Sequence, residues 1–257
     1  MEDTMSAPKQ LAGKRIAVLA ADGFEKAELA APVAALREAG ADVVIVGLHA
    51  GRIRGMDVQQ AAELVAVDLE MSQARAPDFD GLLIPGGYIS PDLLRQSAQA
   101  RDLVRHMDAL GKPIAVLSQA PLLLASSGLV TNRTLTSWPG VRDDMVNAGA
   151  IWLNEEVVRD LNWLSSRSAE DVPALVRAMI PFFEGQSEAG ATVRRAQSDP
   201  QRQEPSETPG QPLRWLATPS VGAMLSLALL GIGVVASNRV RRQKQAMPAE
   251  PEPPPAQ

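Results

Sequence analysis

The sequence predicts an α/β layered fold, in which buried parallel strands alternate with helices. Apolar runs at 15–20 and 42–47 lack the alternation of a half-exposed strand and are typical of strands buried on both faces. Helix-like segments follow them, and the same order then repeats further along the chain. The predicted strands cover 15–20, 42–47, 80–85 and 113–117, and the predicted helices cover 25–39, 92–110, 120–127 and 170–184.

The first and last predicted helices have clear signals. The helix over 25–39 ends at Gly40, and its Pro32 removes the hydrogen-bond donor that the carbonyl of residue 28 would normally meet. The last helix carries apolar residues at helical spacing, which predicts that it packs on one face of the sheet. These residues are Val172, Leu175, Val176, Met179, Ile180 and Phe183.

Composition excludes several classes of protein. A chain of 257 residues with 46% hydrophobic content can bury a sizeable core. Its formal net charge of −5 provides no global positive field, so nucleic acid is not an expected partner. The absence of cysteine excludes disulfides and thiolate metal sites, and we expect no metal and no cofactor.

Changes in composition divide the chain. A polar leader over 1–12 lacks the apolar core of a secretory signal, and the α/β domain covers 13–185. Residues 186–213 are rich in Gly, Ser, Gln, Glu, Arg and Pro, which predicts a flexible linker. Residues 239–257 form a basic and then proline-rich tail, for which we expect disorder.

The segment 214–238 is a candidate transmembrane helix. It has no charged residue after Arg214, and its length meets the roughly 20 apolar residues that a bilayer requires. A buried helix of the soluble domain is the alternative, which the preceding linker disfavours. The cluster Arg239, Arg241, Arg242 and Lys244 would place the tail inside by the positive-inside rule. Because a folded domain without a signal peptide crosses a membrane less readily than a short tail, we expect a single-pass C-terminal anchor in the lipid bilayer and a cytoplasmic domain.

Ser118 stands at a strand-to-helix corner, directly after the apolar run 113–117. Amides at the start of a helix stabilise negative charge, so a nucleophile would be useful there. An alcohol is a poor nucleophile near neutral pH unless a base removes its proton. The two histidines of the chain, His49 and His106, are more typical of surface or helix-face positions than of a catalytic base.

Four segments together resemble the DJ-1/PfpI family of the class I glutamine amidotransferase-like superfamily, over roughly residues 13 to 185. They read DGFEKAE at 22–28, DGLLIPGG at 80–87, TSWPGVRDD at 136–144 and NAGA at 147–150. The resemblance implies a flavodoxin-like three-layer sandwich with a parallel sheet, and homodimers or larger rings. It also implies activities of proteases, glyoxalases or protein-repair hydrolases.

The resemblance also assigns roles to particular residues. The family's corner carries Cys-His where this chain has Ser118-Gln119, and some members use a histidine at the position of Trp138. Glu28 matches the family glutamate that hydrogen-bonds the cysteine, and the glycine pair matches a pocket for an anion or a carbonyl. The expected catalytic residues are Ser118 and Glu28, and the expected ligand-binding residues are Gly86, Gly87, Gln119 and Trp138.

Two functions follow as hypotheses. The leading one is a membrane-tethered pseudoenzyme, which keeps the pocket for a small-molecule ligand or for assembly as a homo-oligomer. The alternative is a protease-, glyoxalase- or deglycase-like hydrolase in which Ser118 replaces cysteine and Glu28 accepts its proton. In that case the amides of Gly87 and Gln119 would stabilise an oxyanion.

Overall fold

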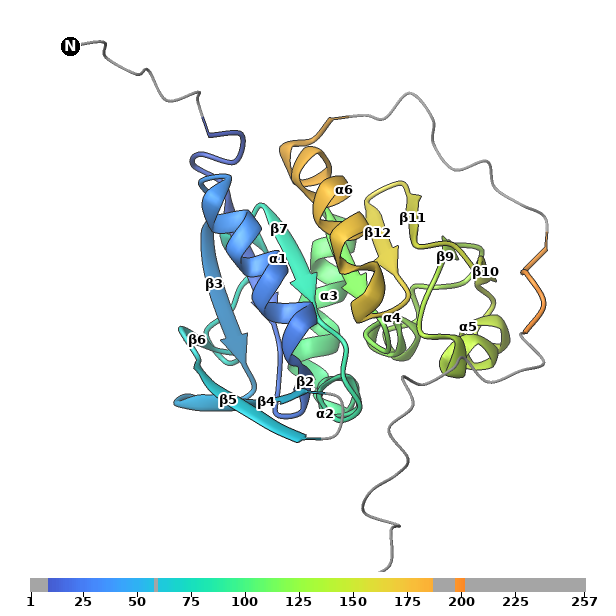
Figure 1. Cartoon of the computed structure of the whole chain (residues 1–257), viewed down its shortest axis with the longest axis horizontal. Coiled ribbons are helices and arrows are strands. Elements are labelled where there is room, and N and C mark those ends of the chain that lie inside the picture. Colours follow the sequence, from blue (N-terminus) through green and yellow to red (C-terminus); the bar gives the residue numbers. More distant parts are fainter. Residues whose placement is uncertain (1–8, 58–59, 187–196, 202–257) are drawn as a thin grey trace, which may run out of the picture. The chain divides into compact units, whose positions relative to one another are not determined.

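The computed structural model of the chain describes residues 9–57, 60–186 and 197–201, and it has the α/β architecture that the sequence predicts (Figure 1). The predicted anchor at 214–238 and the tail at 239–257 lie outside the described residues, as do most of the leader and of the linker. Within the described part of the chain, no helix is both long and apolar enough to cross a membrane.

A mostly parallel sheet forms the centre of the domain. Its strands lie in the order β11-β12-β8-β7-β1-β3-β6, and only β11 runs antiparallel to its neighbour. Numbered along the chain, its five main parallel strands have the flavodoxin-like order 2-1-3-4-5. The strands are β1 (Arg15–Leu19), β3 (Asp42–Gly47), β6 (Leu69–Glu70), β7 (Gly81–Ile84), β8 (Ile114–Leu117), β11 (Val157–Asp160) and β12 (Trp163–Ser166).

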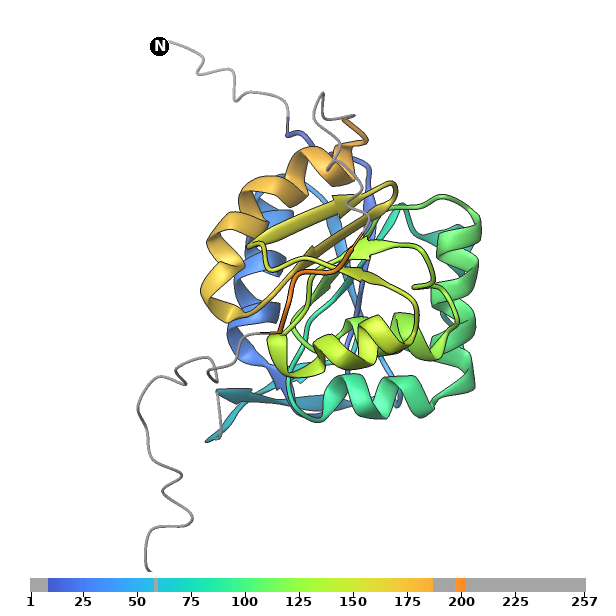
Figure 2. The ribbon, with the colours of Figure 1, turned by 90° about the vertical axis from the view of Figure 1, so that its right-hand side faces the viewer.

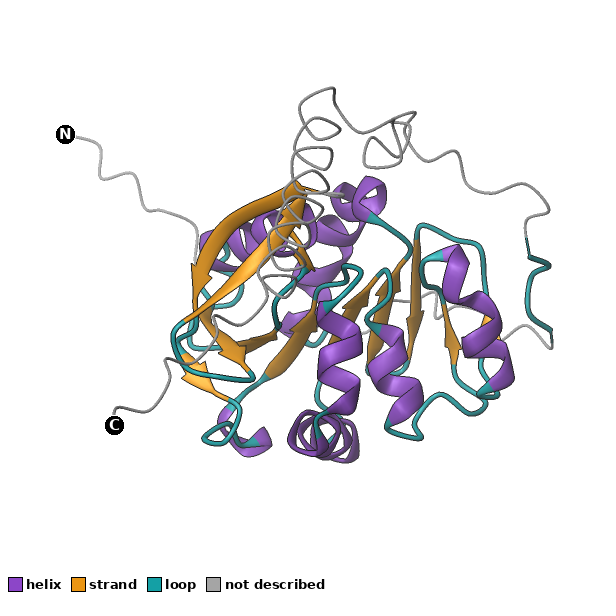
Figure 3. Ribbon diagram, turned by 90° about the horizontal axis from the view of Figure 1, so that it is seen from below, coloured by secondary structure: helices purple, strands orange, loops and turns teal. Residues whose placement is uncertain are grey.

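Helices cover both faces of this sheet (Figure 3). Side chains alternate along β1, so that Ile16 and Val18 pack with α1 and α6, while Ala17 and Leu19 pack with the helices of the other face. This alternation gives each face its own apolar layer. The helices are α1 (Lys26–Glu38), α2 (Ser90–Gln96), α3 (Ala98–Ala109), α4 (Pro121–Ser126), α5 (Arg142–Asn147) and α6 (Val172–Glu184).

The segment 92–110, predicted as one helix, is divided into α2 and α3. The break falls at Ser97, whose backbone is extended and whose Oγ accepts a hydrogen bond from the amide of Ala100 at 3.2 Å. Serine at this position caps a new helix, because its side chain satisfies an amide that has no partner within the helix. The prediction of a single helix is therefore wrong at this point. The described residues also contain three 3₁₀ turns, at Ala76–Asp78 (η1), Pro139–Val141 (η2) and Ala169–Asp171 (η3).

Two smaller sheets were not predicted. One joins β2 (Phe24–Glu25), β4 (Arg52–Asp57) and β5 (Gln60–Ala66), and the other pairs β9 (Thr134–Leu135) with β10 (Ile151–Trp152). The strands β4 and β5 contain many exposed polar residues, and β9 and β10 are very short. Both features weaken the apolar periodicity on which a prediction depends.

Residues 197–201 lie within the segment whose composition indicates a linker, yet they pack on the domain. The amide of Asp199 donates to the carbonyl of Trp152 at 2.8 Å, and the amide of Trp152 donates to Ser198 Oγ at 2.9 Å. We call residues 197–201 the strap. It runs beside β10 and is the short dark orange segment in Figure 2.

Candidate active site

Ser118 occupies the corner between β8 and α4 in a left-handed backbone conformation, with φ of 56°. Main-chain hydrogen bonds hold it there: its amide donates to the carbonyl of Ser166, and its carbonyl accepts from the amide of Trp138, both at 2.9 Å. A non-glycine residue in this region is strained, and such strain persists where the surroundings determine the conformation. The predicted position of Ser118 at the carboxyl end of its strand is confirmed.

Glu28 reaches this corner from α1. Its side chain is buried, with 2% of the residue exposed, and Oε2 accepts a hydrogen bond from the amide of Gly86 at 2.8 Å. Burial raises its pKa from 4.5 to about 7, against the opposing effects of hydrogen bonds with Ser118 and Gly86, and the charge of Glu25 raises it further. A carboxyl with a pKa near neutrality can both accept and return a proton at physiological pH.

Gly86 and Gly87 allow the main chain to lie close to Ser118 and Glu28. A Cβ at Gly86 would lie 2.4 Å from Ser118 Cβ and 2.6 Å from Glu28 Oε2, so a side chain cannot be accommodated without movement. Gly87 has φ of 109°, which only glycine adopts readily, and its amide donates to Gln119 Oε1 at 3.2 Å. The structure therefore brings Glu28, Gly86 and Ser118 together at the corner.

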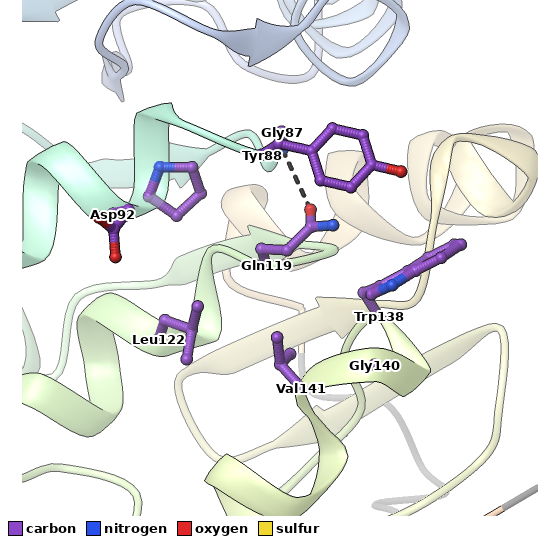
Figure 4. Close-up of a pocket in the computed structure, with 9 residues that line it drawn as sticks. Gly87, Tyr88, Asp92, Gln119, Leu122, Trp138, Gly140 and Val141 are labelled. Carbon is purple, nitrogen blue, oxygen red and sulfur yellow. Dashed lines mark hydrogen bonds between the residues drawn. The ribbon is translucent and has the colours of Figure 1, made fainter. Parts of the chain in front are cut away.

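A pocket of about 290 Å³ opens beside this group (Figure 4). Three of the predicted ligand-binding residues, Gly87, Gln119 and Trp138, line it. Ser118, Glu28 and Gly86 are not part of its wall, and Ser118 is only 4% exposed. The wall residues that sequence reasoning did not select are Tyr88, Pro91, Asp92, Leu122, Gly140 and Val141.

The walls of the pocket are largely aromatic and aliphatic. The side chain of Gln119 lies between the Tyr88 and Trp138 sides of the cavity in Figure 4, with its carboxamide directed toward Gly87. Asp92 is the one charged residue in the wall, and Arg95 pairs with its carboxylate at 2.6 Å. Among the described residues that line the pocket, none carries a cationic side chain. Among the residues described, no group of three potential metal ligands occurs.

Comparison with known proteins defines the class. The chain belongs to the DJ-1/PfpI family, whose model matches residues 14–181. It is 38% identical to Deglycase PfpI of Pyrococcus furiosus over 169 residues, which cover 66% of this chain and 99% of the relative. A deglycase of Pyrococcus abyssi is 37% identical, with the same coverage. The crystal structure of Drosophila melanogaster DJ-1beta superposes with a TM-score of 0.61 at 27% identity, over 67% of this chain and 91% of that one.

Proposed function

We propose that the chain is a hydrolase of the deglycase type, in which Ser118 is the nucleophile and Glu28 is its proton acceptor. One observation carries the proposal: a buried carboxyl, whose pKa is raised to about 7, lies with Ser118 around Gly86 at a strained strand-to-helix corner. The relatives named deglycases support this interpretation over the non-catalytic one. The substrate would carry a small acyl group whose carbonyl carbon bears a leaving oxygen, nitrogen or sulfur atom.

The reaction would proceed in two displacements. With an ester, thioester or amide, ionised Glu28 removes the hydroxyl proton of Ser118, and Oγ attacks the acyl carbon that bears the leaving atom to give a tetrahedral oxyanion. Glu28 returns the proton to the leaving atom as its bond to carbon breaks. Water then releases the acyl group from Ser118 by the same route, which restores the hydroxyl. General-base assistance of this kind contributes about 10²–10⁴-fold to a rate.

The amide of Gly87 is the candidate donor to the oxyanion. In the structure it is occupied by Gln119 Oε1, so the carboxamide must rotate away before the substrate oxygen can accept the same hydrogen bond. Ser118 must also become more accessible, since it is buried beside the cavity. Rotation of Gln119 would serve both needs, because its side chain lies in the wall of the pocket.

The test uses the full-length chain with p-nitrophenyl acetate as an ester probe and with methylglyoxal adducts of amino acids as deglycase probes. We expect Ser118→Ala to abolish turnover, and Glu28→Gln to lower kcat by about 10²–10⁴-fold. Ser127→Ala is the matched control, because Ser127 is another buried serine whose Oγ donates to a helix carbonyl, that of Leu123. Turnover that survives in Ser118→Ala would refute the assignment of the nucleophile.

Binding without turnover is a second candidate function. It is favoured by the contact between Gln119 and Gly87, which fills the oxyanion position, and by the absence of a histidine from the pocket wall. In that case neither class of probe would be hydrolysed by the wild-type chain. Gln119→Ala distinguishes the two candidates: a hydrolase with a freed Gly87 amide retains or gains esterase activity, whereas a pure binding protein shows none.

We also propose that residues 214–238 anchor the protein in a membrane, with the domain on the cytoplasmic side. The charge-free apolar sequence and the basic cluster after it support this proposal. Full-length protein should resist extraction by alkaline wash, whereas a chain ending at residue 213 should be released. Digestion of the domain by protease added to intact cells would contradict the orientation. Homo-oligomerisation stays a prediction, which light scattering of the same preparations would test.

A further inference from the structure

The strap covers the free edge of β10. Ser198 Oγ accepts from the amide of Trp152, and the amide of Asp199 donates to the carbonyl of the same residue. A carboxylate oxygen of Asp199 accepts from the amide of Asn154 at 2.9 Å. Together these bonds satisfy successive main-chain groups that an edge strand otherwise leaves without a partner.

A chain of hydrogen bonds leads from this edge to the corner of the active site. The indole N–H of Trp152 donates to Ser137 Oγ at 2.9 Å, and that hydroxyl donates to the carbonyl of Trp138 at 3.1 Å. Trp138 lines the pocket, and its amide donates to the carbonyl of Ser118. Because Trp152 and Ser137 are buried, loss of either side-chain bond would leave a polar group that water cannot reach and that has lost its hydrogen-bond partner.

Arg142 provides a second connection. Its Nε donates to the carbonyl of Asp199 at 2.8 Å, and its guanidinium lies 5.9 Å from the centre of the Trp152 ring. The side chain is only 14% exposed. Arg142 directly follows η2, which supplies Gly140 and Val141 to the wall of the pocket. The strap therefore bonds Arg142, the residue that follows the wall segment, while Ser118 bonds Trp138 at the start of that segment.

We propose that Ser198 and Asp199 are positioning residues for the pocket: they hold the segment Trp138–Val141 in the place where it forms one wall. They lie beyond residue 181, where the match to the family model ends, so this support is an addition to the family domain. The inference concerns the geometry of the pocket, and only its kinetic consequence rests on the proposed hydrolase function.

Hydrogen exchange in the full-length chain tests the geometry without any assay of activity. The double variant Ser198→Ala with Asp199→Ala removes two side-chain acceptors, and Gln197→Ala is the control, because Gln197 is exposed in the same segment. We expect the amides of Trp138 and Val141 to exchange about tenfold faster in the double variant, as for the loss of one or two net hydrogen bonds. Amides in β1 and β7 report global stability and should be unchanged.

Kinetics with p-nitrophenyl acetate give the second readout. If the wall is mispositioned while Ser118 and Glu28 are intact, KM should rise by about threefold to tenfold in the double variant with little change in kcat. Arg142→Ala should act in the same direction, and Arg142→Lys should restore part of the effect. Unchanged exchange at Trp138 and Val141 would overturn the inference. If the wild-type chain hydrolyses no probe, the proposed hydrolase function fails, while the exchange result still decides the role of the strap.

Discussion

Two polar clusters lie at opposite ends of the central sheet, one buried and one partly buried, and they differ in how their charged groups are paired. At the carboxyl end, Glu28 faces Ser118 and the amide of Gly86, and no ion pair joins it to a cation among the residues that the structure describes. At the amino end, Arg133 pairs with Asp160 at 2.9 Å and Asp108 at 3.5 Å. The guanidinium also lies 3.7 Å from the centre of the Trp163 ring.

The difference in charge pairing suits the two clusters to different roles: the cluster around Glu28 can transfer a proton, and the cluster around Arg133 stabilises the fold. Around Arg133, hydrogen bonds and opposite charges compensate the cost of removing ions from water. Around Glu28, that cost is largely uncompensated and appears instead as a raised pKa. A buried acid of this kind destabilises the folded state when ionised, and it is also the type of group that can move a proton. Four measurements test whether the two clusters differ in this way.

The largest effect is expected for Arg133→Ala, which leaves Asp108 and Asp160 without their cation. The side chains of Arg133 and Asp160 are 12% and 10% exposed, so the loss should approach the cost of breaking a fully buried pair, which is about 3–5 kcal/mol. Urea unfolding of the wild type and the variant measures this loss. Lys26→Ala is the control, because the pair of Lys26 with Glu63 is exposed and contributes about 0–1 kcal/mol. Equal losses in the two variants would show that the amino-end cluster has no special structural role.

Glu28→Gln should stabilise the protein at about pH 8, by up to about 3 kcal/mol. The folded-state pKa of about 7 lies above the ordinary value of 4.5, so the folded state binds the extra proton between these values. Stability from this group is therefore fully present below about pH 4.5 and is lost as pH rises through about 7. Glutamine mimics the protonated carboxyl and removes this loss. Unfolding measured at both ends of the range should give a difference only at the higher pH.

Hydrolysis by the wild type should increase with pH in parallel with ionisation of Glu28. For a base with a pKa of about 7, kcat/KM at about pH 5 should be about 100-fold below its plateau above about pH 8. The profile of kcat/KM against pH, measured with p-nitrophenyl acetate, checks this expectation. A midpoint that stays in place in the Glu28→Gln variant would assign the titration to another group.

The smallest effect concerns backbone strain at the corner. Ser118→Gly should gain about 0.5–1 kcal/mol, because glycine adopts positive φ without steric cost but loses more chain entropy. Leu161→Gly is the matched control: Leu161 has φ of 55° and is 73% exposed in the turn between β11 and β12. We expect both variants to gain similar stability, and only the variant at Ser118 to lose activity. Destabilisation at Ser118 alone would mean that its hydroxyl contributes to folding.

The parts of the fold and site that the sequence predicted depend on local patterns. Buried strands are continuous apolar runs, and the corner at Ser118 follows directly from one of them. The break between α2 and α3 could have been predicted from Ser97, because serine is a preferred residue at the start of a helix. Tyr88 also had a signal, because it follows the glycine pair and is the one tyrosine of the chain.

Other features depend on contacts between distant segments, which periodicity does not report. The raised pKa of Glu28 arises from its burial beside Gly86 and Ser118, which are distant from it in the sequence, and composition indicates nothing about it. The strap is similar: its polar, proline-containing sequence is typical of a linker, and its order derives from hydrogen bonds to β10, more than 40 positions earlier. Long-range pairing of this kind overrides local preference.

The corner at Ser118 has an evolutionary consequence. Its backbone conformation is fixed by main-chain hydrogen bonds with Ser166 and Trp138, which do not involve the side chain at position 118. Replacement of this side chain by another small one therefore leaves the scaffold in place. Serine and cysteine codons can differ by a single base, so a lineage can exchange an oxygen nucleophile for a sulfur one in one mutational step, without first having to rebuild the loop that presents it.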